Sequence, residues 1–106
     1  MFRGQTVSLV IPAHDEEETI VQVIEEFRQD QHLDEILVVD NNCTDRTAEL
    51  ARAAGARVVT ESRPGYGSAL KAGMSQAKGD ILVLTEADGS FRARDLVKLL
   101  SYLEDA

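Results

Sequence analysis

The amino-acid sequence predicts an α/β fold: a Rossmann-like, three-layer sandwich with a mostly parallel sheet of about four strands and helices on both faces. Four short runs of β-branched and aliphatic residues alternate with stretches whose apolar residues recur at helical spacing. The runs are mainly apolar and do not alternate strictly with polar residues, which is typical of parallel strands covered on both sides. Each crossover between them is expected to be right-handed.

The first strand is expected over residues 7–11, where Pro12 ends the ladder because proline has no backbone N–H to donate. The acidic residues 15–18 come next and suit the positive end of a helix. Four apolar residues at helical spacing predict the buried face of this helix: Ile20, Val23, Ile24 and Phe27.

The second strand is expected over residues 36–39 and ends at Asp40. Thr44 is the expected N-cap of the next helix, and Asp45 is also assigned to capping. Gly55 is placed to take the left-handed conformation that ends this helix.

The third strand is expected over residues 57–60, followed by a glycine-rich turn at 64–67. The helix after this turn is expected to bury Leu70, Met74 and Ala77 before a second stop at Gly79. A fourth strand over residues 81–84 precedes a last helix with one apolar face: Leu96, Val97, Leu100 and Leu103.

Length and charge exclude several classes of protein. A chain of 106 residues fits one domain with one core. The net charge of -8 argues against a nucleic-acid partner, which needs a basic stripe, and against electrostatic docking on anionic lipid. Cys43 is the single cysteine, so no internal disulfide forms and a reducing, cytoplasmic setting is expected. No apolar run approaches the ~20 residues of a membrane helix, although anchoring at the cytoplasmic face of a membrane by segments outside this sequence stays open.

Polar residues follow every predicted strand, at the edge where open α/β sheets bind ligands. They are Pro12, Ala13, His14, Asp15 and Glu16 after the first strand, Asp40, Asn41 and Asn42 after the second, Glu61, Ser62 and Arg63 after the third, and Glu86, Ala87, Asp88 and Gly89 after the fourth. A ligand site at this edge is the favoured interpretation, and the alternative is that loops carry polar residues for solubility.

Glu86 and Asp88 are two carboxylates two residues apart at the end of a buried strand, so both can reach one hard cation. Mg²⁺ or Mn²⁺ held there would neutralise a diphosphate leaving group. The alternative is an ordinary turn, since Asp88 and Gly89 are common turn residues. Asp40 and Asn41 could read a nucleobase edge or hold a ribose hydroxyl, or they could only build the turn before the next helix.

The stretch Gly65–Gly73 opens a helix, whose free N–H groups favour anions, and Gly67 and Lys71 within it are candidate nucleotide-binding residues. It is neither a Walker loop nor the dinucleotide fingerprint, because no Gly-Lys-Ser/Thr closes it and the first βα turn has no glycine. His14 could line a base pocket or be an ordinary surface histidine, and Cys43 is interpreted as a small turn residue. The sequence holds no Ser/His/Asp set and no zinc-ligand spacing.

Taken in order, these motifs resemble family 2 glycosyltransferases. Residues 7–18, VSLVIPAHDEEE, are similar to the family's opening V-x-V-V-I-P-A-Y-N-E-E. Residues 38–47, VVDNNCTDRT, are similar to V-V-D-D-G-S-T-D-G-T, and residues 79–90, GDILVLTEADGS, to G-D-x-x-x-x-x-D-A-D-G. Residues 65–73 resemble the connecting G-x-G-x-A-L-x-x-G. The most similar subset is the polyprenyl-phosphate (dolichol-phosphate) mannosyl- and glucosyltransferases.

The resemblance implies a GT-A fold, a UDP- or GDP-sugar donor, a divalent metal and a polyprenyl phosphate acceptor. Pro12, Ala13, His14 and Glu16 would flank base and ribose, and Asp40 and Asn41 would contact the base. Glu86, Ala87 and Asp88 would stand for the aspartate–x–aspartate motif, with Asp88 the principal metal ligand and Glu86 the second. His14 replaces a tyrosine of the family pattern, Asn41 an aspartate and Glu86 the first aspartate, which lengthens that ligand by one methylene.

Residues 1–106 are therefore expected to be the N-terminal, nucleotide-sugar-binding part of a GT-A domain, with the acceptor-binding half absent. The resemblance places the catalytic base beyond Ala106, so weak nucleotide binding and poor transfer are expected of this chain. Self-association or pairing is expected through the surface that the missing half would cover. The alternative function is a non-catalytic nucleotide-sugar-binding or regulatory module. A phosphoacceptor receiver domain is disfavoured because no lysine follows the last strand.

Overall fold

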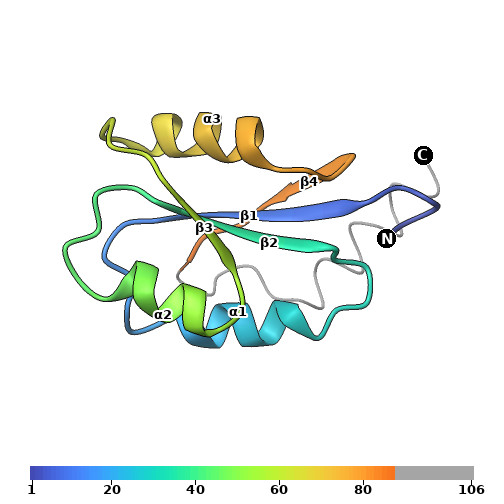
Figure 1. Ribbon diagram of the computed structural model, residues 1–106, viewed down its shortest axis with the longest axis horizontal. Helices are drawn as coiled ribbons and strands as arrows, with labels where there is room; N and C mark the ends of the chain where they lie inside the picture. The colour runs from blue at the N-terminus through green and yellow to red at the C-terminus, as the bar shows by residue number, and fades with distance from the viewer. Residues whose placement is uncertain (88–106) are drawn as a thin grey trace.

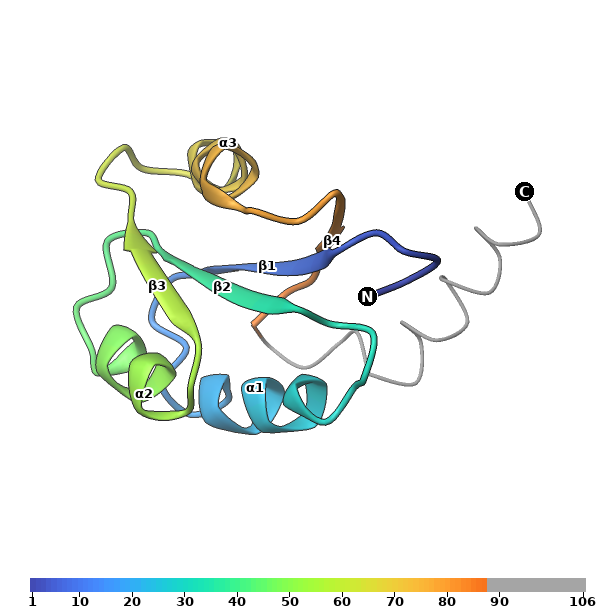
Figure 2. The same cartoon turned by 45° about the vertical axis from the view of Figure 1, so that its right-hand side comes forward.

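The computed structural model describes residues 1–87, which form a parallel sheet between two layers of helix. The elements are β1 (Val7–Ala13), α1 (Ile20–Arg28), β2 (Glu35–Asp40), α2 (Thr47–Ala53), β3 (Arg57–Thr60), α3 (Tyr66–Gln76) and β4 (Ile81–Leu84). The strands pair in parallel in the order β3-β2-β1-β4. Helix α3 covers one face of the sheet, and α1 and α2 cover the other (Figures 1 and 2). The predicted α/β sandwich is confirmed.

The central strand β1 is longer than its sequence predicts. Pro12 does not end the ladder, because β1 continues to Ala13 and Pro12 pairs with Val39 of β2. In a strand, the backbone N–H and C=O groups of residues two apart point toward the same neighbouring strand. The Val10 carbonyl points toward β4 and accepts the Thr85 N–H at 3.1 Å, so a backbone N–H at position 12 would also point toward β4. Pairing with β4 ends at Val10, so the N–H that proline lacks would have no partner on that side.

Helix α1 buries the four residues that its periodicity predicts: Ile20, Val23, Ile24 and Phe27. These side chains join β1 and α2 in the larger of two apolar clusters. Helix α1 begins at Ile20, after the acidic run rather than within it, and holds no acidic residue in its first turn. The acidic residues therefore belong to the loop between β1 and α1.

Helix α2 begins at Thr47, and the prediction that Thr44 caps it is wrong. The Thr44 N–H donates to Asp15 Oδ1 at 2.7 Å, so this residue ties two loops together instead. The capping role expected of Asp45 is not found either, because Arg46 is the N-cap and makes no side-chain capping hydrogen bond. Asp45 precedes it, and its Oδ1 accepts the Thr47 N–H at 3.0 Å. Gly55 ends this segment with φ +101°, the left-handed conformation that the sequence predicts.

Helix α3 packs on β1 and β2 through small residues, not through the predicted Leu70 and Met74. Its buried residues are Ala69 and Gly73, whereas Met74 is 54% exposed. Ala77, just after the helix, is partly buried against the same apolar cluster as Ala69. A Cβ on Gly73 would lie 2.3 Å from Cγ1 of Val10, so the helix lies too close to the sheet for any side chain there. Large residues are excluded from this contact, and the apolar periodicity therefore indicates the wrong face.

A polar network closes the amino ends of the strands, on the side of the sheet away from the predicted site. The Glu35 carboxylate accepts from Ser8 Oγ at 2.8 Å, Lys78 N–H at 3.0 Å and Arg57 Nη1 at 2.9 Å. Burial opposes ionisation of Glu35, yet these hydrogen bonds hold its pKa below the usual value. The network fixes the loop between α3 and β4 to the sheet.

Two further expectations concern the chain beyond β4. The predicted helix with Leu96, Val97, Leu100 and Leu103 lies outside the described residues, as does Asp88. Within residues 1–87, no helix has the length and apolar character needed to cross a membrane.

Candidate functional site

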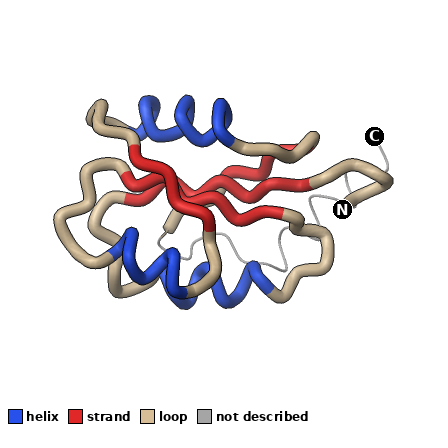
Figure 3. The backbone as a smooth tube through the Cα atoms, viewed as in Figure 1, coloured by secondary structure: helices blue, strands red, loops and turns tan. Residues whose placement is uncertain are grey.

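The loops that follow β1, β2 and β3 gather at one end of the sheet, where the carboxyl ends of the parallel strands meet (Figure 3). An open cleft of about 550 Å³ lies there. Eight of the residues expected at this edge line it: Pro12, Ala13, His14, Glu16, Asn41, Asn42, Ser62 and Glu86. The strand-edge argument therefore locates the cleft correctly.

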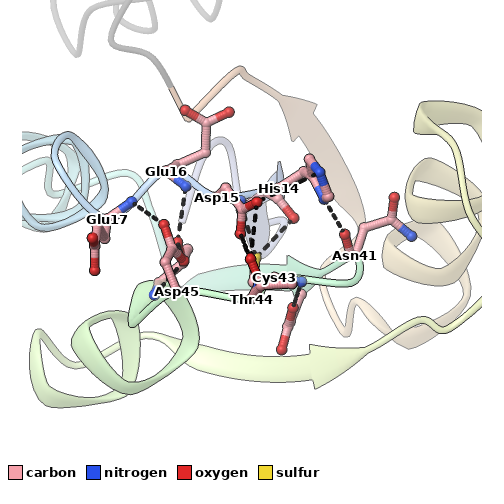
Figure 4. Close-up of polar contacts among 11 residues, drawn as sticks. His14, Asp15, Glu16, Glu17, Asn41, Cys43, Thr44 and Asp45 are labelled. Carbon is pink, nitrogen blue, oxygen red and sulfur yellow. Dashed lines mark hydrogen bonds and ion pairs between the residues drawn. The ribbon is translucent and has the colours of Figure 1, made fainter.

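The β1–α1 loop is locked to the β2–α2 loop by a set of hydrogen bonds (Figure 4). Asp15 adopts φ +52°, and its carboxylate receives the Thr44 N–H. His14 Nδ1 lies 2.8 Å from the backbone oxygen of Asn41. The Glu16 N–H donates to Thr47 Oγ1 at 2.9 Å. These contacts hold the His14 ring and Glu16 at the cleft with little dependence on a ligand.

Asn41 is buried, and its side chain holds the third loop. Its Nδ2 donates to the backbone oxygens of Glu61 at 3.0 Å and Arg63 at 2.8 Å. Both amide hydrogens are therefore used within the fold, and in the described part of the chain no hydrogen bond to Asn41 Oδ1 is found. The donors of Asn41 therefore hold the loop after β3 rather than the turn before α2.

Asp40 does not line the cleft. Its Oδ1 accepts the Cys43 N–H at 2.9 Å, so in the described residues it shapes the turn after β2. Gly67 and Lys71 are exposed on α3 and also lie outside the cleft lining.

The end of β4 supplies one carboxylate to the cleft. Glu86 is exposed and lines it. Ala87 is buried, and its carbonyl accepts the Thr19 hydroxyl at 2.7 Å, which ties the end of β4 to the start of α1. Asp88 lies outside the described residues, so the predicted carboxylate pair is represented by Glu86 alone.

The sequence analysis assigned no individual ligand-binding role to four residues of the lining. They are Pro64 and Gly65, in the β3–α3 connection, and Tyr66 and Ala69, on α3. The signal that could have found them is the glycine-rich turn itself, because an aromatic residue between two glycines at a helix start is poorly placed to enter a core. Burial raises the pKa of the Tyr66 phenol, and the neighbouring Glu86 carboxylate raises this pKa further.

A second group of ligand-type atoms lies behind the cleft. One atom each of Asp15, Cys43 and Asp45 lies within 4.8 Å of the others. Burial raises the pKa of the Cys43 thiol to about 11, so the sulfur is a neutral thiol near pH 7. Its Sγ receives the Asp15 N–H and donates to the Ala13 oxygen, each at 3.4 Å. The group is a structural joint between two loops, in keeping with the turn role expected of Cys43.

Comparison with known proteins agrees with this geometry. Residues 8–106 match the family model described as Glycosyl transferase family 2. The chain belongs to glycosyl transferase family 2. The family that the sequence motifs resemble is thus confirmed.

Three similar proteins illustrate the match. The chain is 45% identical over 101 residues to an uncharacterized glycosyltransferase of Mycobacterium tuberculosis, covering 95% of this chain and 45% of the relative. It is 42% identical over 95 residues to glucosyl-3-phosphoglycerate synthase of Mycolicibacterium paratuberculosis, covering 80% of this chain and 29% of that one. A crystal structure of a mycobacterial protein superposes with a TM-score of 0.87 at 37% identity, covering 97% of this chain and 38% of the other.

Some of the solved structures that match this chain carry ligands. Glucosyl-3-phosphoglycerate synthase from Mycobacterium tuberculosis, in complex with Mn²⁺, UDP and glucosyl-3-phosphoglycerate, matches with a TM-score of 0.73 and 39% identity, covering 79% of this chain and 34% of that chain. The chain thus spans less than half the length of each of these four proteins. None of these names supports the polyprenyl-phosphate subset that the sequence resembles.

Proposed function

We propose that this chain is the nucleotide-sugar-binding part of a family 2 glycosyltransferase, and that its cleft binds a UDP-sugar with Mg²⁺ or Mn²⁺. The observation that carries this proposal is the cleft of about 550 Å³ at the carboxyl edge of the sheet, within the usual size of small-molecule sites. Family membership and the UDP and Mn²⁺ of the glucosyl-3-phosphoglycerate synthase complex support it.

The nucleoside would occupy the inner part of the cleft. Pro12 and Ala13 offer apolar surface there, and the Asn41 carbonyl oxygen can accept a hydrogen bond from a ring N–H such as that of uracil. Because the side-chain donors of Asn41 are already used by the β3–α3 loop, base recognition by this residue is limited to acceptance.

The metal would lie at the Glu86 end of the cleft. An exposed carboxylate is a hard oxygen donor of the kind that Mg²⁺ and Mn²⁺ prefer, so the chemistry of Glu86 fits the metal. We assign Glu86 and Asp88 as its protein ligands. A metal held there supplies positive charge that neutralises the diphosphate as the sugar departs.

The proposal covers the binding of the donor and not the acceptor. The polyprenyl phosphate acceptor suggested by the sequence resemblance has no support among the named relatives, and the acceptor that accompanies UDP in one related structure is a phosphoglycerate derivative. The catalytic base and the acceptor site are assigned to no residue of this chain.

The test is calorimetric titration of UDP and GDP with and without Mn²⁺, on the wild type and on Glu86→Gln. The substitution removes a charged metal ligand while keeping the side-chain shape. We expect Mn²⁺ to tighten UDP binding by the wild type, and this enhancement to fall roughly tenfold or more in Glu86→Gln, since even outer-shell groups of metal sites are worth about that much.

Glu49→Gln is the matched control, because it removes the same charge from a side chain on α2 that is 70% exposed. Its Mn²⁺ enhancement should equal that of the wild type. A full Mn²⁺ enhancement in Glu86→Gln would remove Glu86 from the metal site. Absence of UDP binding by the wild type would overturn the function itself.

A further inference from the structure

Tyr66 is an aromatic residue that lines the cleft and is 52% exposed. It is the first residue of α3 and follows Gly65, whose φ of +105° sets the turn into the helix. Its ring belongs to neither apolar cluster of the described residues. A large apolar ring left in water at a concave surface gains free energy when a ligand covers it.

The position of Tyr66 is fixed by the packing of its helix. Ala69, one turn further along α3, is 1% exposed and also lines the cleft. Gly73, one more turn on, lies against Val10 with no room for a side chain. Since α3 rests directly on the sheet, the ring of Tyr66 is held over the cleft by the backbone rather than by a flexible loop.

A second ring reaches the cleft from the other side of the sheet. His14 follows β1 on the way to α1, whereas Tyr66 begins α3 on the opposite face (Figure 1). The His14 side chain is 63% exposed and is anchored through Nδ1 to the Asn41 backbone oxygen. No contact between these two rings occurs in residues 1–87. Both rings line the same cleft, and aromatic faces are suited to contact with a flat heterocycle.

We propose that Tyr66 is a donor-contacting residue whose ring packs against the nucleobase of the bound nucleotide. This inference rests on the proposed function, because it takes the occupant of the cleft to be a UDP-sugar. The hydroxyl end of Tyr66 lies beside Glu86, and the ring therefore extends along the cleft toward the carboxylate assigned to the metal. Tyr66 thus adds an aromatic contact that none of the sequence-predicted residues on α3 provides.

Ring packing makes a specific demand on the ligand. The contact depends on the π-face of the base and not on the diphosphate or the metal, so it must contribute to the binding of uridine alone. Replacing the ring by alanine should weaken uridine and UDP by the same factor, roughly 5- to 150-fold from the usual strength of base–aromatic stacking. Replacement by phenylalanine keeps the ring and should preserve the affinity for uridine.

The experiment compares four proteins: wild type, Tyr66→Ala, Tyr66→Phe and Met74→Ala. Met74 is the matched control, since it is an apolar residue on the same helix, 54% exposed, and does not line the cleft. Uridine and UDP are titrated by calorimetry in the absence of Mn²⁺, after urea unfolding has shown that each variant is folded. The expected result is a loss of both affinities in Tyr66→Ala, with Tyr66→Phe and Met74→Ala unchanged.

Wild-type affinity in Tyr66→Ala would overturn the contact while leaving the proposed function intact. A loss for UDP with no loss for uridine would also overturn it, because the ring would then act on the diphosphate. Equal losses in Tyr66→Ala and Met74→Ala would show a general effect on α3 and reject the inference. If the wild type bound neither uridine nor UDP, the proposed function would fail together with it.

Discussion

Asn41 contacts two of the loops that form the cleft, through its side chain and its backbone oxygen. Its side-chain amide donates to two backbone oxygens of the β3–α3 connection, and its backbone oxygen lies 2.8 Å from Nδ1 of His14. The same residue therefore positions a ring on one side of the cleft and the segment leading to Tyr66 on the other. A buried residue with this many fixed partners is expected to matter for stability as well as for binding.

Asn41→Ala should lower the free energy of unfolding by about 1–3 kcal/mol, because it leaves the carbonyls of Glu61 and Arg63 without donors. Urea unfolding at equilibrium measures the change. The control is Asn42→Gly, which removes one exposed hydrogen bond to Ser62 and suits the φ of +61° at that position. Its effect should stay within about 0.5 kcal/mol. An equal loss in both variants would contradict the role of Asn41.

Sequence reasoning identified Asn41 but not how it works. A strand-end position is visible in the sequence, whereas the partners of a side chain depend on which loop folds over it. The same limit applies to Thr44, which has the right chemistry for a helix cap but is taken by Asp15 across the β1–α1 loop. Local preferences were overridden in both cases by contacts between loops that are far apart in the chain.

At the scale of elements, α3 is the helix whose sequence is most misleading. Strands β3 and β4 match their predicted runs, because β-branched and aliphatic residues favour strands even at the edges of the sheet. Helix α3 instead contacts the sheet through Ala69 and Gly73. Hydrophobic periodicity does not identify a helix face that packs through small residues. Because this face packs on the sheet, the larger Tyr66 and Met74 are exposed.

Gly73→Ala tests this packing. The added Cβ would meet Cγ1 of Val10 at 2.3 Å, so the helix must shift and the free energy of unfolding should fall by about 1–3 kcal/mol despite the better helix propensity of alanine. Gly67→Ala is the control on the same helix, because nothing lies within 4 Å of its added Cβ. Thermal or urea unfolding should show no loss of stability for Gly67→Ala. A stable Gly73→Ala variant would mean that α3 lies farther from the sheet.

At the scale of the whole molecule, the two ends of the sheet differ: one is closed by a polar network and the other carries an open cleft. The amino ends of the strands are closed by the Glu35 network, whose polar groups bond to one another. The carboxyl ends carry the open cleft. This asymmetry was predictable from the sequence, since parallel strands bring their carboxyl ends together. The identity of the lining residues on the β3–α3 connection was not, because their positions depend on how α3 rests on the sheet.

The central claim is that a uridine nucleotide occupies this cleft, and the most direct measurement is an NMR titration of the backbone amides with UDP. Binding should shift signals from residues 13–16, 41–42, 62–69 and 86, which line the cleft or adjoin its lining. Amides of the opposite end, such as those of Thr6, Ser8 and Lys78, should stay in place. Shifts centred on that opposite end, or no shifts at saturating UDP, would contradict the account.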